Sequence, residues 1–184
     1  MTRPHGPILV LGIGNVLLRD EGAGVHVIRA LQGLVDRGDV ELPPGTWVLD
    51  GGTLGLDLLP LISDARAVLL VDAIDGGRAP GAVEVIRGDA LRDAQAGQVL
   101  AHRVGVGDLL ATARLTGALP EAVALVGIQP SEIDVGLELT EIVRAAVPEA
   151  VAAALHELRR LDAMAPASGP GLGAGARDVK GAAA

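Results

Sequence analysis

Four polar side chains near the ends of apolar segments could carry chemistry in this chain of 184 residues. They are the carboxylates Glu21, Asp50 and Asp72 and the imidazole of His102. Two carboxylates and one neutral imidazole, as Glu21, Asp72 and His102 would supply, suit a divalent transition metal such as Ni²⁺ or Zn²⁺. These positions are far apart in the sequence, so their spacing is not diagnostic and the fold would have to bring them together.

Each of these residues also has an ordinary structural explanation. An acid such as Glu21 in a first helical turn is favoured by the helix dipole. Asp50, before a glycine pair, can organise a turn, and His102 can bond a backbone carbonyl. Asp72 is harder to explain in this way, because an acid that abuts the apolar Val68–Val71 is costly unless it is paired or ligating. The other histidines are expected at the surface: His5, His26 and His156.

The elements that must position these side chains begin with short, continuous apolar runs. Such runs, unlike alternating ones, are typical of strands buried on both faces in a parallel sheet. Four runs are expected to form parallel strands: Ile8–Leu11, Trp47–Leu49, Val68–Val71 and Ala122–Val126. A fifth segment, Ala82–Ile86, follows a short turn-rich connection and is expected to be an antiparallel strand at an edge.

Helical patterns separate these strands. One helix is expected after Asp20, which is placed to cap it. Three more are expected: Leu54–Ile62, Gly107–Leu115 and Thr140–Leu161. Pro148 should kink the last or start a second helix there. The alternation predicts a three-layer α/β/α sandwich. Because the carboxyl ends of parallel strands meet at one rim, the three carboxylates named above should collect there, and His102 can join them.

Composition bounds the organisation of the chain. Its length favours one domain, which we place at residues 1–162. Residues 163–184 are rich in Ala, Gly and Pro, carry little aliphatic bulk and are expected to be a disordered tail. The absence of cysteine excludes thiolate catalysis and thiolate metal sites.

Charge and hydropathy limit the partners. A net charge of −8 and a single aromatic residue, Trp47, argue against a nucleic acid partner. No apolar run approaches the length that spans a membrane, and the run at Ile8–Leu11 is too short for a signal peptide. We therefore expect a cytoplasmic protein without membrane insertion.

A second motif competes for the first loop. Gly12-Ile13-Gly14 resembles the start of a dinucleotide-binding loop, but Leu17 stands where the third glycine would fall, and Asp50 lies well beyond the ~20 residues usual for the ribose-binding acid. A Walker lysine is impossible because the sole lysine is Lys180. No Gly-x-Ser-x-Gly elbow occurs either. A dinucleotide-binding module is thus the less favoured alternative.

The segment from Ile8 to Gly24 resembles the opening signature of the hydrogenase maturation endopeptidases. Four further segments match that family in order: Leu49–Thr53, Val71-Asp72-Ala73, Ala101-His102 with Gly105, and Leu125–Pro130. The resemblance extends over about residues 7–162, which is nearly everything outside the tail.

The resemblance implies a protease that trims a C-terminal extension from the large-subunit precursor of a [NiFe] hydrogenase after nickel insertion, and so activates the hydrogenase. The family's metal-binding positions carry over to Glu21, Asp72 and His102, with nickel arriving in the precursor and zinc or cadmium able to replace it in vitro. Asp72 and Asp50 carry over as catalytic candidates of an aspartyl-type protease. The implied fold is a twisted, mostly parallel five-stranded sheet between helices, in a protein that we expect to be a monomer.

Two mechanisms are open within this resemblance. In one, substrate-bound nickel polarises the scissile carbonyl or a water molecule. In the other, nickel docks the peptide and a rim carboxylate activates water as general base. A covalent acyl-enzyme is not expected, because the chain has no cysteine and no Ser/His/Asp arrangement. A non-enzymatic, nickel-sensing chaperone of the precursor is the main alternative.

Overall fold

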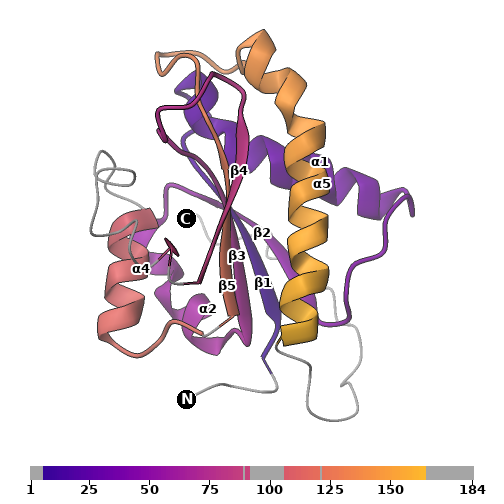
Figure 1. Cartoon of the computed structure of the whole chain (residues 1–184), viewed down its shortest axis with the longest axis vertical. Helices are drawn as coiled ribbons and strands as arrows, with labels where there is room; N and C mark the ends of the chain where they lie inside the picture. The colour runs from indigo at the N-terminus through magenta and orange to yellow at the C-terminus, as the bar shows by residue number, and fades with distance from the viewer. Residues whose placement is uncertain (1–5, 89, 92–105, 121, 165–184) are drawn as a thin grey trace, which may run out of the picture.

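The computed structural model describes residues 6–88, 90–91, 106–120 and 122–164. Its centre is a five-stranded sheet with the strand order β2-β1-β3-β5-β4 (Figure 1). The strands are β1 (Ile8–Ile13), β2 (Thr46–Gly52), β3 (Ala67–Ala73), β4 (Val83–Arg87) and β5 (Ala122–Ile128). The first three and β5 are parallel, whereas β4 pairs antiparallel with β5 at one edge. The predicted mostly parallel sheet with an antiparallel edge strand is confirmed.

Burial distinguishes the inner strands from β2. Every residue of β1, β3 and β5 is buried, as continuous apolar runs indicate. The other edge strand, β2, is largely half-buried, and the side chain of Trp47 is 49% exposed. The expectation that Trp47–Leu49 is buried on both faces is therefore wrong, because β2 has a neighbouring strand on one side alone and helices cover it incompletely.

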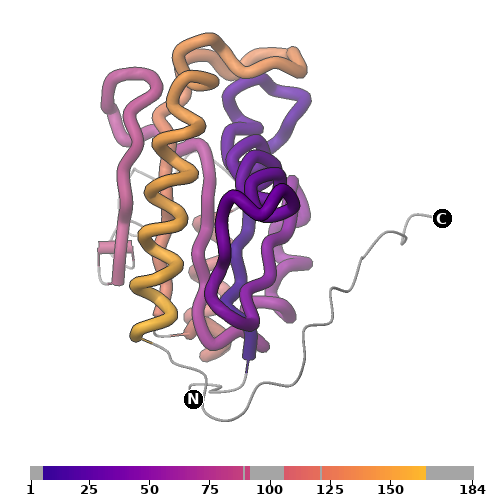
Figure 2. The backbone as a smooth tube through the Cα atoms, turned by 90° about the vertical axis from the view of Figure 1, so that its right-hand side faces the viewer, coloured from indigo at the N-terminus to yellow at the C-terminus, as the bar shows by residue number. Residues whose placement is uncertain are grey.

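Two helical layers enclose the sheet. Helices α1 (Ala23–Asp36) and α5 (Glu141–Met164) cover one face. The 3-10 helix η2 (Gly55–Leu58), α2 (Leu59–Asp64) and α4 (Val106–Leu115) lie on the other (Figures 1 and 2). The predicted three-layer α/β/α sandwich is thus confirmed.

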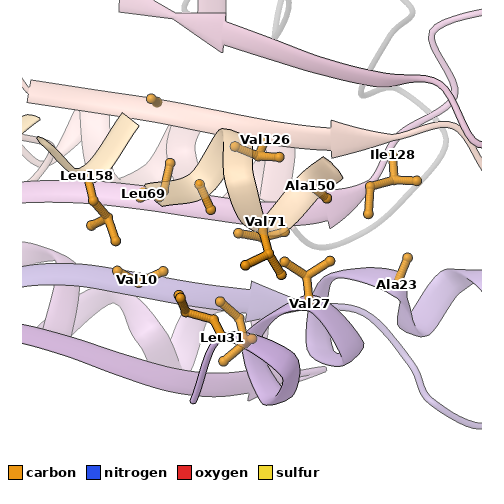
Figure 3. Packing of buried hydrophobic residues seen from close by; sticks show 14 of the residues in the cluster. Val10, Ala23, Val27, Leu31, Leu69, Val71, Val126, Ile128, Ala150 and Leu158 are labelled. Atoms are coloured by element: carbon orange, nitrogen blue, oxygen red, sulfur yellow. The ribbon is translucent and has the colours of Figure 1, made fainter. Parts of the chain in front are cut away.

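The core follows from the alternation of side chains along each strand. Val10, Leu69 and Val71 face α1 and α5, where they pack with Val27 and Leu31 (Figure 3). The intervening strand residues face the layer of α2 and α4; among them are Leu9, Leu11, Val68 and Leu70. Both half-cores are aliphatic, and together they pack the helices against the two faces of the sheet.

Three helix boundaries differ from the sequence prediction. Helix α1 begins at Ala23 after the 3-10 helix η1 (Arg19–Gly22), and Gly22 rather than Asp20 occupies its N-cap position. The single helix expected at Leu54–Ile62 is divided into η2 and α2, with a proline in the first turn of α2. Helix α5 is continuous through Pro148, so the alternative of a second helix there is wrong.

Helix α5 also moves the predicted domain boundary. It runs to Met164, so residues 163 and 164 belong to the folded domain rather than to the tail. The remaining part of the predicted tail, residues 165–184, lies outside the described residues. Within the described part of the chain, no helix is both long enough and apolar enough to cross a membrane.

A buried carboxylate connects α5 to the edge strand β4. Glu157 is fully buried and accepts hydrogen bonds from Arg87 on β4, one of them at 2.9 Å from Nε. Arg160 Nε donates a further bond at 2.7 Å. Burial by itself raises the pKa of Glu157, but the bonds from Arg87 and Arg160 outweigh it and leave that pKa below its ordinary value. The ionised carboxylate therefore helps to hold β4 against the helix.

Candidate active site at the carboxyl edge of the sheet

The carboxyl ends of β1, β2, β3 and β5 meet at one edge of the sheet, at the top of Figure 1. Asp72 is the residue before the last in β3, and Asp50 lies near the end of β2. Glu21 lies in η1, which contacts β3. The structure therefore brings the three predicted carboxylates to the same edge, as the strand-end rule requires.

Two glycines allow the segment that carries Glu21 to lie close to the ends of β1 and β3. Gly14 has a φ of +133°, and a Cβ there would lie 1.9 Å from the backbone oxygen of Glu21. At Gly24, in the first turn of α1, a Cβ would lie 2.2 Å from the backbone oxygen of Val71, the residue before Asp72. No other residue fits at either position without moving the backbone. These contacts fix Glu21 beside the end of β3.

Asp72 is a buried carboxylate on the face of the sheet that α4 covers. Its neighbours in the same alternation, Leu70 and Ile74, belong to the half-core on that face. One carboxylate oxygen accepts a hydrogen bond of 2.8 Å from the backbone N–H of Ala73. In the adjacent strand β5 the partner of Asp72 is Gly127. Because Gly127 has no side chain, the side chain of Ile74 occupies the space that a Cβ there would fill.

Asp50 has defined partners of its own. Its Oδ2 accepts a hydrogen bond of 3.0 Å from the guanidinium of Arg29, and its Oδ1 accepts one of 3.1 Å from the backbone N–H of Gly52, whose φ is positive. The turn-organising role is therefore present. Because Gly12 pairs with Asp50 on one side and with Val71 on the other, Asp50 lies about 10 Å, two strand spacings, from β3.

His102 lies outside the described residues, so its position relative to the carboxylates stays a prediction. Helix α4, which begins at Val106, covers the face of the sheet that contains Asp72. Within the described ranges, no group of three histidine, aspartate or glutamate side chains is arranged to hold a metal ion. Since His102 is not among those residues, the proposed ligand set of Glu21, Asp72 and His102 is untested by this finding.

The sequence interpretation missed the role of Asp20. Its side chain is fully buried, and both oxygens bind the loop that follows β5. Oδ2 accepts bonds from the N–H groups of Ser131 and Glu132 at 2.9 and 3.0 Å and from the hydroxyl of Thr140 at 2.8 Å, and Oδ1 accepts one from the N–H of Thr140 at 2.7 Å. Burial alone raises the pKa of Asp20, but these bonds outweigh it and lower that pKa. In the sequence, Asp20 was recognisable as an acid before a predicted helix and by nothing that pointed to the distant loop.

Gln129 was also missed as an organiser of the edge. Its Oε1 accepts hydrogen bonds from the N–H groups of Gly76 and Arg78 at 2.9 and 3.1 Å, and its Nε2 donates one of 3.1 Å to Asp75. The amide thereby shapes the loop that follows β3 and Asp72. A polar residue directly after a continuous apolar strand is the same signal that identified Asp72, and it could have identified Gln129.

The histidine predictions have mixed outcomes. His156 is exposed on α5, as expected, whereas His5 lies outside the described residues. His26 is half-buried rather than at the surface, and its Nε2 has no hydrogen-bond partner among the described residues. Burial and then the charge of Arg29 lower the pKa of His26. The prediction for His26 is wrong, because His26 lies among neighbouring charged groups, Glu138 and Arg144 among them, that are distant in the sequence.

A model of the hydrogenase maturation protease family matches residues 25–157, well over half of the chain. The chain belongs to the hydrogenase maturation protease family. The matched stretch contains Asp50, Asp72 and His102 and begins after Glu21. Membership in a family of proteases favours the protease over the non-enzymatic chaperone and gives no support to the dinucleotide-binding alternative.

Curated relatives and solved structures agree with this membership. The hydrogenase expression/formation protein HupM of Azotobacter chroococcum mcd 1 is 41% identical over 157 residues, which cover 84% of this chain and 73% of the relative. The hydrogenase 2 maturation protease of Escherichia coli K12 is 34% identical over 153 residues, with coverages of 83% and 90%. The hydrogenase maturating endopeptidase HybD from E. coli matches the fold with a TM-score of 0.73 and 34% identity, over 84% of this chain and 93% of HybD. The fold of this maturation protease family member is therefore similar to that of HybD.

Proposed function

We propose that this protein is the endopeptidase that removes the C-terminal extension of a [NiFe] hydrogenase large-subunit precursor after nickel has been inserted. In this proposal it acts as a monomer in the cytoplasm on a precursor that brings its own nickel. Membership in the maturation protease family supports the reaction class. The observation that carries the assignment of the site is the close approach of the Glu21 segment to the ends of β1 and β3, at Gly14 and Gly24 respectively.

The chemistry of the donors fits nickel carried by a substrate. Glu21 and Asp72 supply carboxylate oxygens from rigid neighbouring elements, and His102 would supply the imidazole nitrogen that Ni²⁺ favours. Three protein ligands leave coordination positions for groups of the precursor. Zinc or cadmium in the precursor is expected to occupy the same positions in vitro. The side chains would thus bind a precursor that contains metal in preference to one that does not.

Hydrolysis then requires a water molecule and a proton acceptor. The water oxygen forms the new bond to the scissile carbonyl carbon, the C–N bond breaks, and the leaving amine takes a proton. Of the two catalytic candidates, Asp72 is buried at the end of β3, where it can bind metal or accept the proton of the water. Asp50 is paired with Arg29 and lies two strand spacings away, which favours a supporting role.

The proposal is tested by incubating the protein with nickel-loaded and with nickel-free precursor and measuring the mass of the precursor. We expect loss of the C-terminal extension in the loaded sample alone. Glu21→Gln, Asp72→Asn and His102→Ala should each reduce cleavage by at least ~100-fold while circular dichroism shows a folded protein. His156→Ala, at an exposed position on α5, is the matched control and should cut normally.

Equal cleavage of loaded and nickel-free precursor would refute nickel dependence and leave a metal-independent protease. Binding of the loaded precursor without any change in its mass would instead support the chaperone alternative. A folded Asp72→Asn variant that cuts at the wild-type rate would remove Asp72 from the site.

A further inference from the structure

An exposed apolar surface lies where the loop that follows β5 meets the segment that follows β1. Three large side chains of this region are exposed although no described element packs against them: Leu17 at 58%, Val135 at 80% and Leu137 at 65%. We refer to these three residues as the rim patch. Isolated exposed apolar side chains are common, but a group held together at one place is typical of an interaction surface.

Backbone pairing holds the rim patch together. Leu18 and Gly136 form a parallel β-bridge in which the N–H of Gly136 donates to the carbonyl of Leu17 and the N–H of Arg19 donates to the carbonyl of Gly136, both at 2.9 Å. Leu17 therefore lies beside Val135 and Leu137, which flank Gly136. In both views the loop after β5 lies beside the segment after β1 at the upper end of the molecule (Figures 1 and 2).

Asp20 fixes this surface to the candidate active site. Its carboxylate accepts four hydrogen bonds from Ser131, Glu132 and Thr140, at the two ends of the loop. Asp20 immediately precedes Glu21, so the same short helix holds the loop and a proposed metal ligand. A loop tied down by buried, charge-assisted bonds at both ends is pre-organised, which lowers the cost of binding a partner there.

The charges around the rim patch indicate the partner's chemistry. The loop and the start of α5 carry four acidic side chains: Glu132, Asp134, Glu138 and Glu141. Two arginines pair with members of this group, Arg19 with Glu132 and Arg144 with Glu138. The surroundings therefore keep an excess of negative charge in a chain whose net charge is −8. A complementary partner has an apolar contact surface with basic residues at its margin.

We propose that the rim patch is the docking surface for the body of the hydrogenase large-subunit precursor, which contacts it through an apolar surface with a basic margin. This inference rests on the proposed function and extends it from the metal to the protein that carries it. Docking at the rim patch places the precursor against the segment that carries Glu21. Recognition then has two parts, because the carboxylates bind the metal and the rim patch binds the folded precursor around it.

The test uses Leu17→Ser and Val135→Ser, with Leu115→Ser as the matched control. Leu115 is 88% exposed at the end of α4, away from the rim patch, so Leu115→Ser removes an apolar side chain that is even more exposed than Leu17 or Val135. Binding of nickel-loaded precursor is measured by calorimetry, and cleavage is measured by mass. Each rim variant should raise Kd and KM at least ~10-fold with kcat within about 2-fold of wild type, whereas the control should change neither.

Charge supplies an independent variant. Asp134→Lys replaces a negative charge beside the rim patch by a positive one without removing an apolar side chain, so it should also raise Kd, and added salt should reduce the difference from wild type. Asp134 accepts a hydrogen bond of 2.7 Å from the N–H of Val135 and is not one of the candidate catalytic or metal-binding residues, so kcat should not change.

Different results overturn different statements. If wild-type protein cuts the precursor and the rim variants keep the wild-type Kd and KM, docking at the rim patch is refuted and the protease assignment stands. If wild-type protein binds the precursor through the rim patch but does not cut it, the protease assignment fails and the docking surface stands. If sedimentation shows a wild-type dimer that Val135→Ser dissociates, the surface is a contact between two copies of this chain and the proposal is wrong.

Discussion

Replacing Gly24 by alanine tests whether the close approach of α1 to β3 is what positions Glu21. A Cβ at this position would lie 2.2 Å from the backbone oxygen of Val71 and 2.4 Å from that of Ile13. Ordinary contact begins at 3.4 Å, so the start of α1 would have to withdraw by about 1 Å. Both obstructing atoms belong to the backbone of inner strands, which cannot rotate away as a side chain can.

The expected effects on activity and stability are unequal. A misplacement of about 1 Å between groups that act together can cost ~100-fold in rate, so we expect Gly24→Ala to lower kcat/KM for nickel-loaded precursor by about that factor. Overpacking costs about 1–3 kcal/mol, and alanine returns up to ~1 kcal/mol of helix propensity. The net loss of up to about 2 kcal/mol lowers Tm by up to roughly 8 °C in a chain of this length, which leaves a folded protein at 25 °C.

The same helix offers the control. At Gly33 the nearest atom to an added Cβ is the end of the flexible Arg37 side chain at 3.4 Å, so alanine fits. Gly33→Ala should raise Tm by roughly 2–4 °C through helix propensity and leave cleavage unchanged. Both variants are compared by thermal melting and by the mass assay. Wild-type cleavage by a folded Gly24→Ala protein would refute the statement that this contact positions Glu21.

Three further predictions concern other parts of the molecule. Asp50→Asn should lower kcat by less than ~10-fold, because Asp50 organises its turn and lies two strands from β3; a loss as large as that of Asp72→Asn in the same mass assay would make it the general base. Glu157→Gln should lower the free energy of unfolding at pH 7 by about 1–3 kcal/mol in urea titrations. Because the pKa of Glu157 is lower in the folded than in the unfolded protein, the ionised carboxylate stabilises the fold fully above the unfolded pKa of ~4.3, and this stabilisation is lost as the pH falls through the folded pKa. The unfolding free energies of wild type and Glu157→Gln should therefore converge in acid. Equal values at pH 7 would show that the ion pair contributes nothing. Deleting residues 165–184 should leave Tm and cleavage nearly unchanged, and a large loss of stability would show that this segment packs on the domain.

Local patterns predicted most of the fold, because the inner strands are specified by their own composition. The apolar runs in β1, β3 and β5 are long enough for both faces to be covered, and the structure covers both. The run at Trp47–Leu49 is likewise apolar and continuous but forms an edge strand. Strand order depends on how distant segments pair, and composition within one run does not contain that information.

The site was predictable to the extent that it follows strand ends. The position of Asp72 and Glu21 at one edge was predictable because polar residues after buried parallel strands collect there, whereas their roles in the site stay predictions. Asp20 was misinterpreted as a helix cap because its partners, Ser131, Glu132 and Thr140, follow it by more than a hundred positions in the chain. An aspartate that caps a helix and an aspartate that binds a distant loop look the same in the sequence, and the folded structure distinguishes them.

The exposed position of Trp47 on the edge strand determines which optical signals can follow this protein. The chain has no tyrosine or phenylalanine, and its one indole ring is about half exposed outside both aliphatic half-cores. Its emission in the folded state should already resemble that of an indole in water, so unfolding of the core will change it little. Tryptophan fluorescence will therefore report events near β2, whereas unfolding must be followed by far-ultraviolet circular dichroism or calorimetry.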